Sequence, residues 1–280
     1  MLAREGHMML AHTTWFFVFL GFSVAVLGAC QLAAYADSAA RGWRSRLAIV
    51  GGCVAALLVL ALVWHSQGIA KIDGDVLAKL VGDRNASLNS IFSAVTTMGD
   101  TVPSFLLASL LAIAYYQRTG RARGFVLELM VLVQLVIQNS MPALFHDVTL
   151  TVLDPSVPIG GSGTIPSGSV SRLLSIFLVA ATLWHGYGSR AERVLLGLAP
   201  LVVMTEIVSR LYLGRHLLAD IAAGLLFGVI LTIVFRWVLQ LVEESGSHRA
   251  RRPRRASDAE LGQPSSVVDK SPDSVGTSGG

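Results

Sequence analysis

The sequence predicts an all-α, polytopic membrane protein that folds as a helical bundle. Of its 280 residues, 53% are apolar and only 14% are charged, whereas a soluble domain carries about 25% charged residues. The mean hydropathy is +0.61, and the apolar residues form long runs. Seven of these runs reach the length of roughly 20 residues that a membrane-spanning helix needs. The composition excludes a disordered or collagen-like chain over most of the length.

The spans follow one another with short connectors. The third predicted span is interrupted near its start by Gly99, Asp100 and Pro103. The mixed stretch 68–90 is typical of a short amphipathic helix at the membrane surface. The predicted spans are residues 13–35, 47–66, 91–116, 124–144, 170–187, 192–209 and 217–242.

The basic residues predict the orientation of the chain. If every span is real, all the arginine-rich connectors and the start of the tail fall on one side, and such short basic loops stay in the cytoplasm. The long connector 145–169 on the other side has no Lys or Arg. We therefore expect the N-terminus outside and the tail inside the cell membrane. The basic groups are Arg41, Arg44, Arg46; Arg118, Arg121, Arg123; Arg190, Arg193; and Arg249, Arg251, Arg252, Arg254, Arg255.

The first span has a rival interpretation as a cleaved signal peptide. Small residues at 34–36 resemble a cleavage site, and residues 27–30 resemble a lipoprotein box. Cleavage would place the basic loop after it outside, so the charge pattern favours an uncleaved helix.

The tail differs from the rest in composition. From about residue 245 Ser, Pro, Asp, Gly and Arg dominate, which predicts disorder. The cluster 248–255 is basic, and such clusters are attracted to anionic lipid on the cytoplasmic face. We expect a topology anchor, with membrane lipids as partners. Nucleic acid is not expected, because the basic residues lie between spans and in the tail.

The densest set of polar residues near the membrane lies at residues 209–220. His216 and Asp220 are four residues apart, and so lie on one face of a helix. The carboxylate can hold one imidazole nitrogen and leave the other as base or nucleophile. Arg210 has a fixed charge and a fork that suits phosphate. Glu206 stands one turn before Arg210 and is expected to pair with it.

A second set lies at residues 160–169, before the fifth span. It is rich in Gly and Ser and ends in Pro166-Ser167-Gly168-Ser169. Backbone amides of such a turn at a helix start can bind an anion. The alternative is an ordinary loop followed by a helix N-cap.

These segments resemble a known family. The segment SRLYLGRHLLAD, residues 209–220, resembles the third signature, SRxxxGxHxxxD, of the type 2 phosphatidic acid phosphatase and vanadium haloperoxidase superfamily. The segment 166–169 resembles the second signature, PSGH, in three of four positions. Residues 75–99 also resemble the family's entry region. The resemblance implies a membrane phosphatase core of six helices at 45–242, preceded by an extra transmembrane helix and basic loop at 1–44, and followed by the tail at 243–280.

The resemblance also implies roles for the matching residues. His216 would be the nucleophile that forms a phosphohistidine, and Asp220 would orient it. Arg210 would bind phosphate oxygens together with the Ser167 hydroxyl and the Gly168 amide.

Two departures from the family pattern affect the expected chemistry. The histidine that ends the second signature, thought to protonate the leaving group, is Ser169 here. The first signature, KxxxxxxRP, should lie at the end of the fourth span, yet no Lys or Arg occurs between Arg123 and Arg172.

Two residues are candidate substitutes. Arg172 follows Ser169 by about one turn and is able to bring a cation to the same pocket; the alternative is an arginine that reaches to the headgroups. His146 in the outer loop is a candidate proton donor, and the alternative is a solvated histidine.

We therefore expect an integral membrane phosphatase that acts on a lipid phosphate or, preferably, a diphosphate such as polyprenyl diphosphate, because a phosphate ester leaves without an acid more readily than an alkoxide. The alternative is a relative that binds a lipid phosphate without turnover. A transporter is weaker, since only Glu128 and Glu206 lie well inside spans. A haloperoxidase does not fit, because that branch is usually soluble. No cofactor and no metal are expected, since Cys30 and Cys53 have no metal-ligand spacing.

Overall fold

A computed structural model describes residues 20–32, 43–64, 76, 84–145, 166–185 and 190–261. Apart from short turns, these residues are helical, which confirms the all-α class. The chain divides into two compact units, residues 1–239 and 240–280. In addition to a helix at Leu20–Leu32, the elements are α2 (Trp43–Trp64), α4 (Ala86–Thr96), the 3₁₀ turn η1 (Thr97–Gly99), α5 (Thr101–Thr119), the 3₁₀ turn η2 (Ala122–Phe125), α6 (Val126–Phe145), α7 (Gly168–Trp184), α8 (Arg190–Tyr212) and α9 (Leu218–Leu261).

The helices fall where the apolar runs predict them. Four are long and apolar enough to cross a membrane, and a bent pair of helices makes up to five. Of the two shorter apolar helices, Leu20–Leu32 lies within the first predicted span, and α7 overlaps the fifth but begins two residues earlier. Helices of this length and composition identify an integral membrane protein.

The third span is broken, as its interrupting residues suggest. The helical segment Ala86–Gly99 meets α5 at a bend of 55°. Asp100 stands at the break in an extended conformation, with φ −66° and ψ 160°. The break turns polar backbone and the Asp100 carboxylate toward the interior of the bundle.

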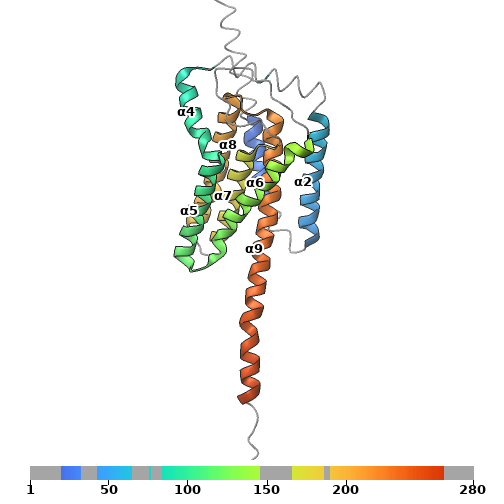
Figure 1. The fold of residues 1–280 in the computed structure, drawn as a ribbon, viewed down its shortest axis with the longest axis vertical. Coiled ribbons are helices and arrows are strands. Elements are labelled where there is room, and N and C mark those ends of the chain that lie inside the picture. The colour runs from blue at the N-terminus through green and yellow to red at the C-terminus, as the bar shows by residue number, and fades with distance from the viewer. Residues whose placement is uncertain are drawn as a thin grey trace, which may run out of the picture. The chain divides into compact units, whose positions relative to one another are not determined.

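Helix α7 is the centre of the first unit. All of its residues except Thr182 are buried, and it packs against α5, α6 and α8 (Figure 1). It also approaches α9 closely: a Cβ atom added at Gly228 would lie 3.2 Å from the Ser171 backbone. Small residues that allow close approach are typical of helix packing in membranes. Because α7 begins at the second signature, this packing fixes the turn that precedes it.

The structure differs from the expected start of the disordered tail, and it describes only part of the expected surface helix. Helix α9 runs to Leu261, past residue 245 where we expected disorder to begin. Residues 249–261 contain five Arg and three Ala, which are good helix formers, so the charge content alone does not prevent a helix. Of the expected surface helix 68–90, only residue 76 and residues 84–90 are described, and α4 begins at Ala86. The outer loop with His146 lies outside the described residues.

Candidate active site

The third-signature segment, residues 209–220, forms a tight turn between α8 and α9. The Leu213 N–H donates to the Ser209 carbonyl at 3.0 Å, and the Arg215 N–H donates to the Arg210 carbonyl at 2.9 Å. Gly214 has φ +63°, a conformation that a residue with a side chain rarely adopts. The glycine therefore lets the chain reverse directly after α8, so that Arg210 and His216 come from opposite sides of one turn.

His216 and Asp220 are buried and contact each other as their spacing predicts. The His216 Nδ1 atom lies 3.4 Å from Asp220 Oδ2, and the Leu217 N–H donates to the same oxygen at 3.0 Å. Their exposed fractions are 7% and 1%. The 3.4 Å separation is long for a strong hydrogen bond, but such catalytic contacts often shorten when a substrate binds. The geometry directs the other ring nitrogen, Nε2, away from the carboxylate.

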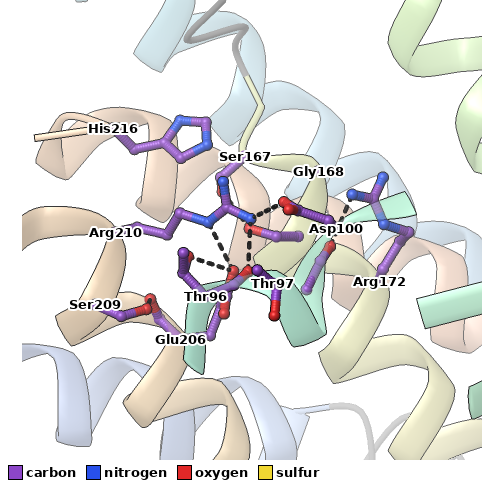
Figure 2. Close-up of polar contacts among 12 residues, drawn as sticks. Thr96, Thr97, Asp100, Ser167, Gly168, Arg172, Glu206, Ser209, Arg210 and His216 are labelled. Carbon is purple, nitrogen blue, oxygen red and sulfur yellow. Dashed lines mark hydrogen bonds and ion pairs between the residues drawn. The ribbon is translucent and has the colours of Figure 1, made fainter. Parts of the chain in front are cut away.

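The serine turn, residues 166–169, lies against the start of α9. The Ser167 N–H donates to the Asp220 carbonyl at 2.9 Å, so the second and third signatures are joined directly. The Ser167 hydroxyl makes no capping hydrogen bond to α7 and lies 3.4 Å from the Ser169 hydroxyl. Figure 2 shows the Ser167 side chain near the His216 ring and the Arg210 side chain. Both hydroxyls are therefore buried without a capping role.

Two glutamines of α6 hold the serine turn in place. The Gln134 Nε2 atom donates to the Gly168 carbonyl at 2.8 Å and to the Ser171 hydroxyl at 2.6 Å. A Cβ atom at position 168 would overlap the side-chain amide of Gln138. A larger residue at position 168 would therefore require the Gln138 side chain to move.

Arg210 is held by two carboxylates and a backbone carbonyl (Figure 2). Its Nε donates to Glu206 Oε1 at 2.7 Å, which confirms the predicted pairing with Glu206. Its Nη2 donates to Asp100 Oδ1 at 2.6 Å and to the Thr96 carbonyl at 3.1 Å. The broken third span therefore supplies two of the three acceptors around this guanidinium.

Arg172 lies in the same polar cluster rather than at the headgroups. It is only 4% exposed, and it donates to Gln138 Oε1 and to the Gly99 carbonyl, each at 2.9 Å. It is close enough to Arg210 for the two charges to interact. Unlike Arg210, it donates to neutral acceptors, so its positive charge is less compensated.

A third arginine borders the cluster. Burial lowers the pKa of Arg215, and the positive charge of Arg210 lowers it further, whereas the carboxylates of Asp100 and Glu206 raise it. The same groups thus act on Arg215 as on Arg172. Among the residues that the structure describes, no group of three or more His, Cys, Asp or Glu side chains could hold a metal ion.

Sequence reasoning missed several members of this cluster. Asp100 was visible as a charge in an apolar span, and such charges are functional candidates by default. Gln134 was visible by counting: from Pro142 backwards, the spacing of the first signature places Gln134 where the family has lysine and Met141 where it has arginine. The amide of Gln134 therefore holds the serine turn from the position of a cation.

The helices and this cluster define a polytopic α-helical membrane protein with a buried His–Asp pair and two arginines beside a serine turn. Residues 106–243 match the family model of the PAP2 superfamily. This match confirms the predicted resemblance to the superfamily over the region from α5 to the membrane part of α9. No curated protein sequence matches the chain.

A solved structure supports the fold. The chain is similar to a transmembrane PAP2-type phosphatidylglycerolphosphate phosphatase from Bacillus subtilis, with a TM-score of 0.59 and 17% sequence identity. The match covers 69% of this chain and 96% of that structure. At this identity the similarity concerns the arrangement of the helices.

Proposed function

We propose that the protein is an integral membrane phosphatase that hydrolyses a lipid phosphate, preferably a diphosphate such as polyprenyl diphosphate, through a phosphohistidine at His216. The observation that carries the proposal is the contact between the signatures, in which the Ser167 N–H meets the Asp220 carbonyl and the His216–Asp220 pair is buried beside Arg210. The match of residues 106–243 to the PAP2 superfamily and the similarity to a transmembrane phosphatase support it.

The proposed reaction has two steps. With Nδ1 turned toward Asp220, the lone pair of His216 Nε2 attacks phosphorus, and the bond from phosphorus to the leaving oxygen breaks with its electron pair on that oxygen. Asp220 stabilises the positive imidazole that forms. Water then attacks the phosphohistidine and releases inorganic phosphate. Arg210, Arg172, the Ser167 hydroxyl and the Gly168 amide would bind the phosphoryl oxygens, since preorganised donors stabilise developing charge.

The preference for a diphosphate follows from the residue at position 169. A serine hydroxyl is a much poorer proton donor than the family's histidine, so a leaving group that needs no proton is favoured. A diphosphate expels a phosphate ester, which leaves as a stable anion, whereas phosphatidate must expel an alkoxide. The loop charges support an extracytoplasmic site with a cytoplasmic tail.

A second candidate function is lipid phosphate binding without turnover. Two observations favour it: Ser169 replaces the proton donor, and two carboxylates already neutralise Arg210. Against it stands the His216–Asp220 pair, because a pure binder does not need an oriented imidazole.

Phosphate release decides between the two functions. The purified, detergent-solubilised protein is incubated with a polyprenyl diphosphate and, separately, with phosphatidate, alongside a His216→Ala variant. We expect release from the diphosphate that disappears in the variant. Equal or faster release from phosphatidate would contradict the diphosphate preference. No release from either substrate would favour the binding function.

A further inference from the structure

The Asp100 carboxylate accepts a hydrogen bond from the Arg210 guanidinium, the group that would bind a substrate phosphate. Its Oδ1 lies 2.6 Å from Arg210 Nη2, and the two side chains are 45% and 6% exposed. A carboxylate at this distance satisfies a donor that would otherwise bind a phosphoryl oxygen. The cluster therefore already contains an anion of its own, held on the broken third span.

The two carboxylates on Arg210 differ in how easily they can leave. The Glu206 side chain is 1% exposed and lies one turn from Arg210 on the same helix. Separating it from Arg210 would leave a buried, unpaired charge, which is strongly unfavourable. The half-exposed Asp100 carboxylate is surrounded by less protein, so moving it away from Arg210 costs less than moving Glu206. Glu206 is thus the permanent partner that orients Arg210, and Asp100 is the displaceable one.

Asp100 also has a second position available. It is the N-cap residue of α5, yet its side chain makes no capping hydrogen bond. Asp is among the preferred N-cap residues, because its carboxylate accepts from the free N–H groups of the first turn and interacts favourably with the helix dipole. A carboxylate that leaves Arg210 therefore finds the Val102 N–H, in the same turn of α5, as a replacement donor.

From these contacts we propose that Asp100 is a specificity-determining residue, which holds Arg210 against weakly charged anions and yields it only to a phosphate with a higher negative charge. A phosphodiester headgroup carries one negative charge, as a carboxylate does, and gains little by displacing Asp100. A terminal phosphate carries about −1.5 to −2 charges at pH 7 and displaces it readily. The proposal rests on the proposed function in one respect, namely that Arg210 binds the substrate phosphate.

Binding of anions tests the proposal without any turnover. The variant Asp100→Asn removes the charge while it keeps the shape and the capping ability of the side chain. Calorimetry on the solubilised protein measures the affinity for inorganic phosphate and for a short-chain phosphatidylglycerol, which is a phosphodiester. We expect Asp100→Asn to bind inorganic phosphate about three- to tenfold more tightly. The phosphodiester should gain by a larger factor than inorganic phosphate, so that discrimination between the two anions decreases; an equal or smaller gain for the phosphodiester would overturn the proposal.

A matched control is present on the same helix as Arg210. Glu192→Gln is also a carboxylate-to-amide change, but Glu192 lies in the first turn of α8, roughly 27 Å along the helix from Arg210. It should leave both affinities unchanged. Unchanged or weaker affinities in Asp100→Asn, or no binding of inorganic phosphate to either form, would overturn the proposal.

Kinetics separate the proposal from a catalytic role of Asp100 and from the proposed function itself. If the wild type releases phosphate, hydrolysis by Asp100→Asn should be inhibited by the phosphodiester, whereas hydrolysis by the wild type should not. A large loss of kcat with unchanged phosphate affinity would make Asp100 a proton donor instead and overturn the proposal. If the wild type releases no phosphate but Asp100→Asn binds it more tightly, the specificity proposal stands and the phosphatase function fails.

Discussion

The third-signature segment and the α6–α7 side of the cluster have diverged from the family pattern to different extents. The segment 209–220 fills every fixed position of its signature, and its turn, His–Asp contact and Glu206 pair are closed by local hydrogen bonds. The α6–α7 side replaces a lysine by Gln134 and a histidine by Ser169. The difference teaches that a nucleophile depends on one exact geometry, whereas an anion can be held by several combinations of donors.

Replacing the proposed nucleophile should have the largest effect. His216→Ala removes the nitrogen that would attack phosphorus, so kcat for diphosphate hydrolysis should fall by at least about 10³-fold. Acid-labile phosphate on the protein, trapped by rapid quenching with labelled substrate, should disappear as well. A labelled phosphoprotein that persists in this variant would show that the nucleophile is not His216.

The guanidinium of Arg210 comes next. Arg210→Lys keeps the charge but loses the fork that contacts Glu206 and Asp100 together, so kcat/KM should fall by about 10²-fold. The measurement is steady-state hydrolysis, with Glu192→Gln as the control. A decrease in kcat/KM of less than threefold would mean that hydrolysis does not require the two-pronged guanidinium of Arg210.

Much of the fold and part of the cluster can be predicted from the sequence, and the reason is physical. The membrane demands long apolar helices, so α2, α6, α8 and α9 appear directly as apolar runs. The Glu206–Arg210 pair is local, at i and i+4, and its spacing alone predicts it. Asp100 and Gln134 were not predicted as members of the cluster, because their contacts with Arg210 and Gly168 join residues 110 and 34 positions apart, and only packing of the helices determines which of them meet.

The third prediction concerns Arg172, which α7 contributes to the cluster as its second arginine beside Arg210. Arg172→Gln should reduce kcat/KM for a diphosphate by about tenfold, mainly through KM, since it removes a phosphate donor but leaves the His–Asp pair untouched. Steady-state hydrolysis over a range of substrate concentrations separates the two constants. A loss confined to kcat would place Arg172 in the transition state alone.

The amide of Gln134 should affect stability more than catalysis. Gln134→Leu keeps the volume but removes one of two side-chain donors to the buried Gly168 carbonyl, which keeps the Ser171 hydroxyl as its donor. The free energy of unfolding should therefore fall by about 0.5–1.5 kcal/mol, the net contribution of one hydrogen bond. Thermal unfolding in detergent measures the change. Gln134→Glu is the sharper variant, because it keeps the shape and brings a buried negative charge beside two acceptors, and so should destabilise more. Equal stability of the leucine variant would mean that the Ser171 hydroxyl alone satisfies this carbonyl.

The smallest effect is expected at the opposite end of α8, where the pair of His185 and Glu192 lies 2.7 Å apart with the His185 side chain 77% exposed. Exposed pairs of this kind contribute little, because water and salt screen them and ordering the side chains costs entropy. Glu192→Gln should therefore change the unfolding free energy by no more than about 0.5 kcal/mol and leave hydrolysis unchanged. The same carboxylate-to-amide change at Glu206 should be severe, because Glu206 is buried against Arg210. Comparable effects at the two positions would show that burial does not set the strength of the Arg210 cluster.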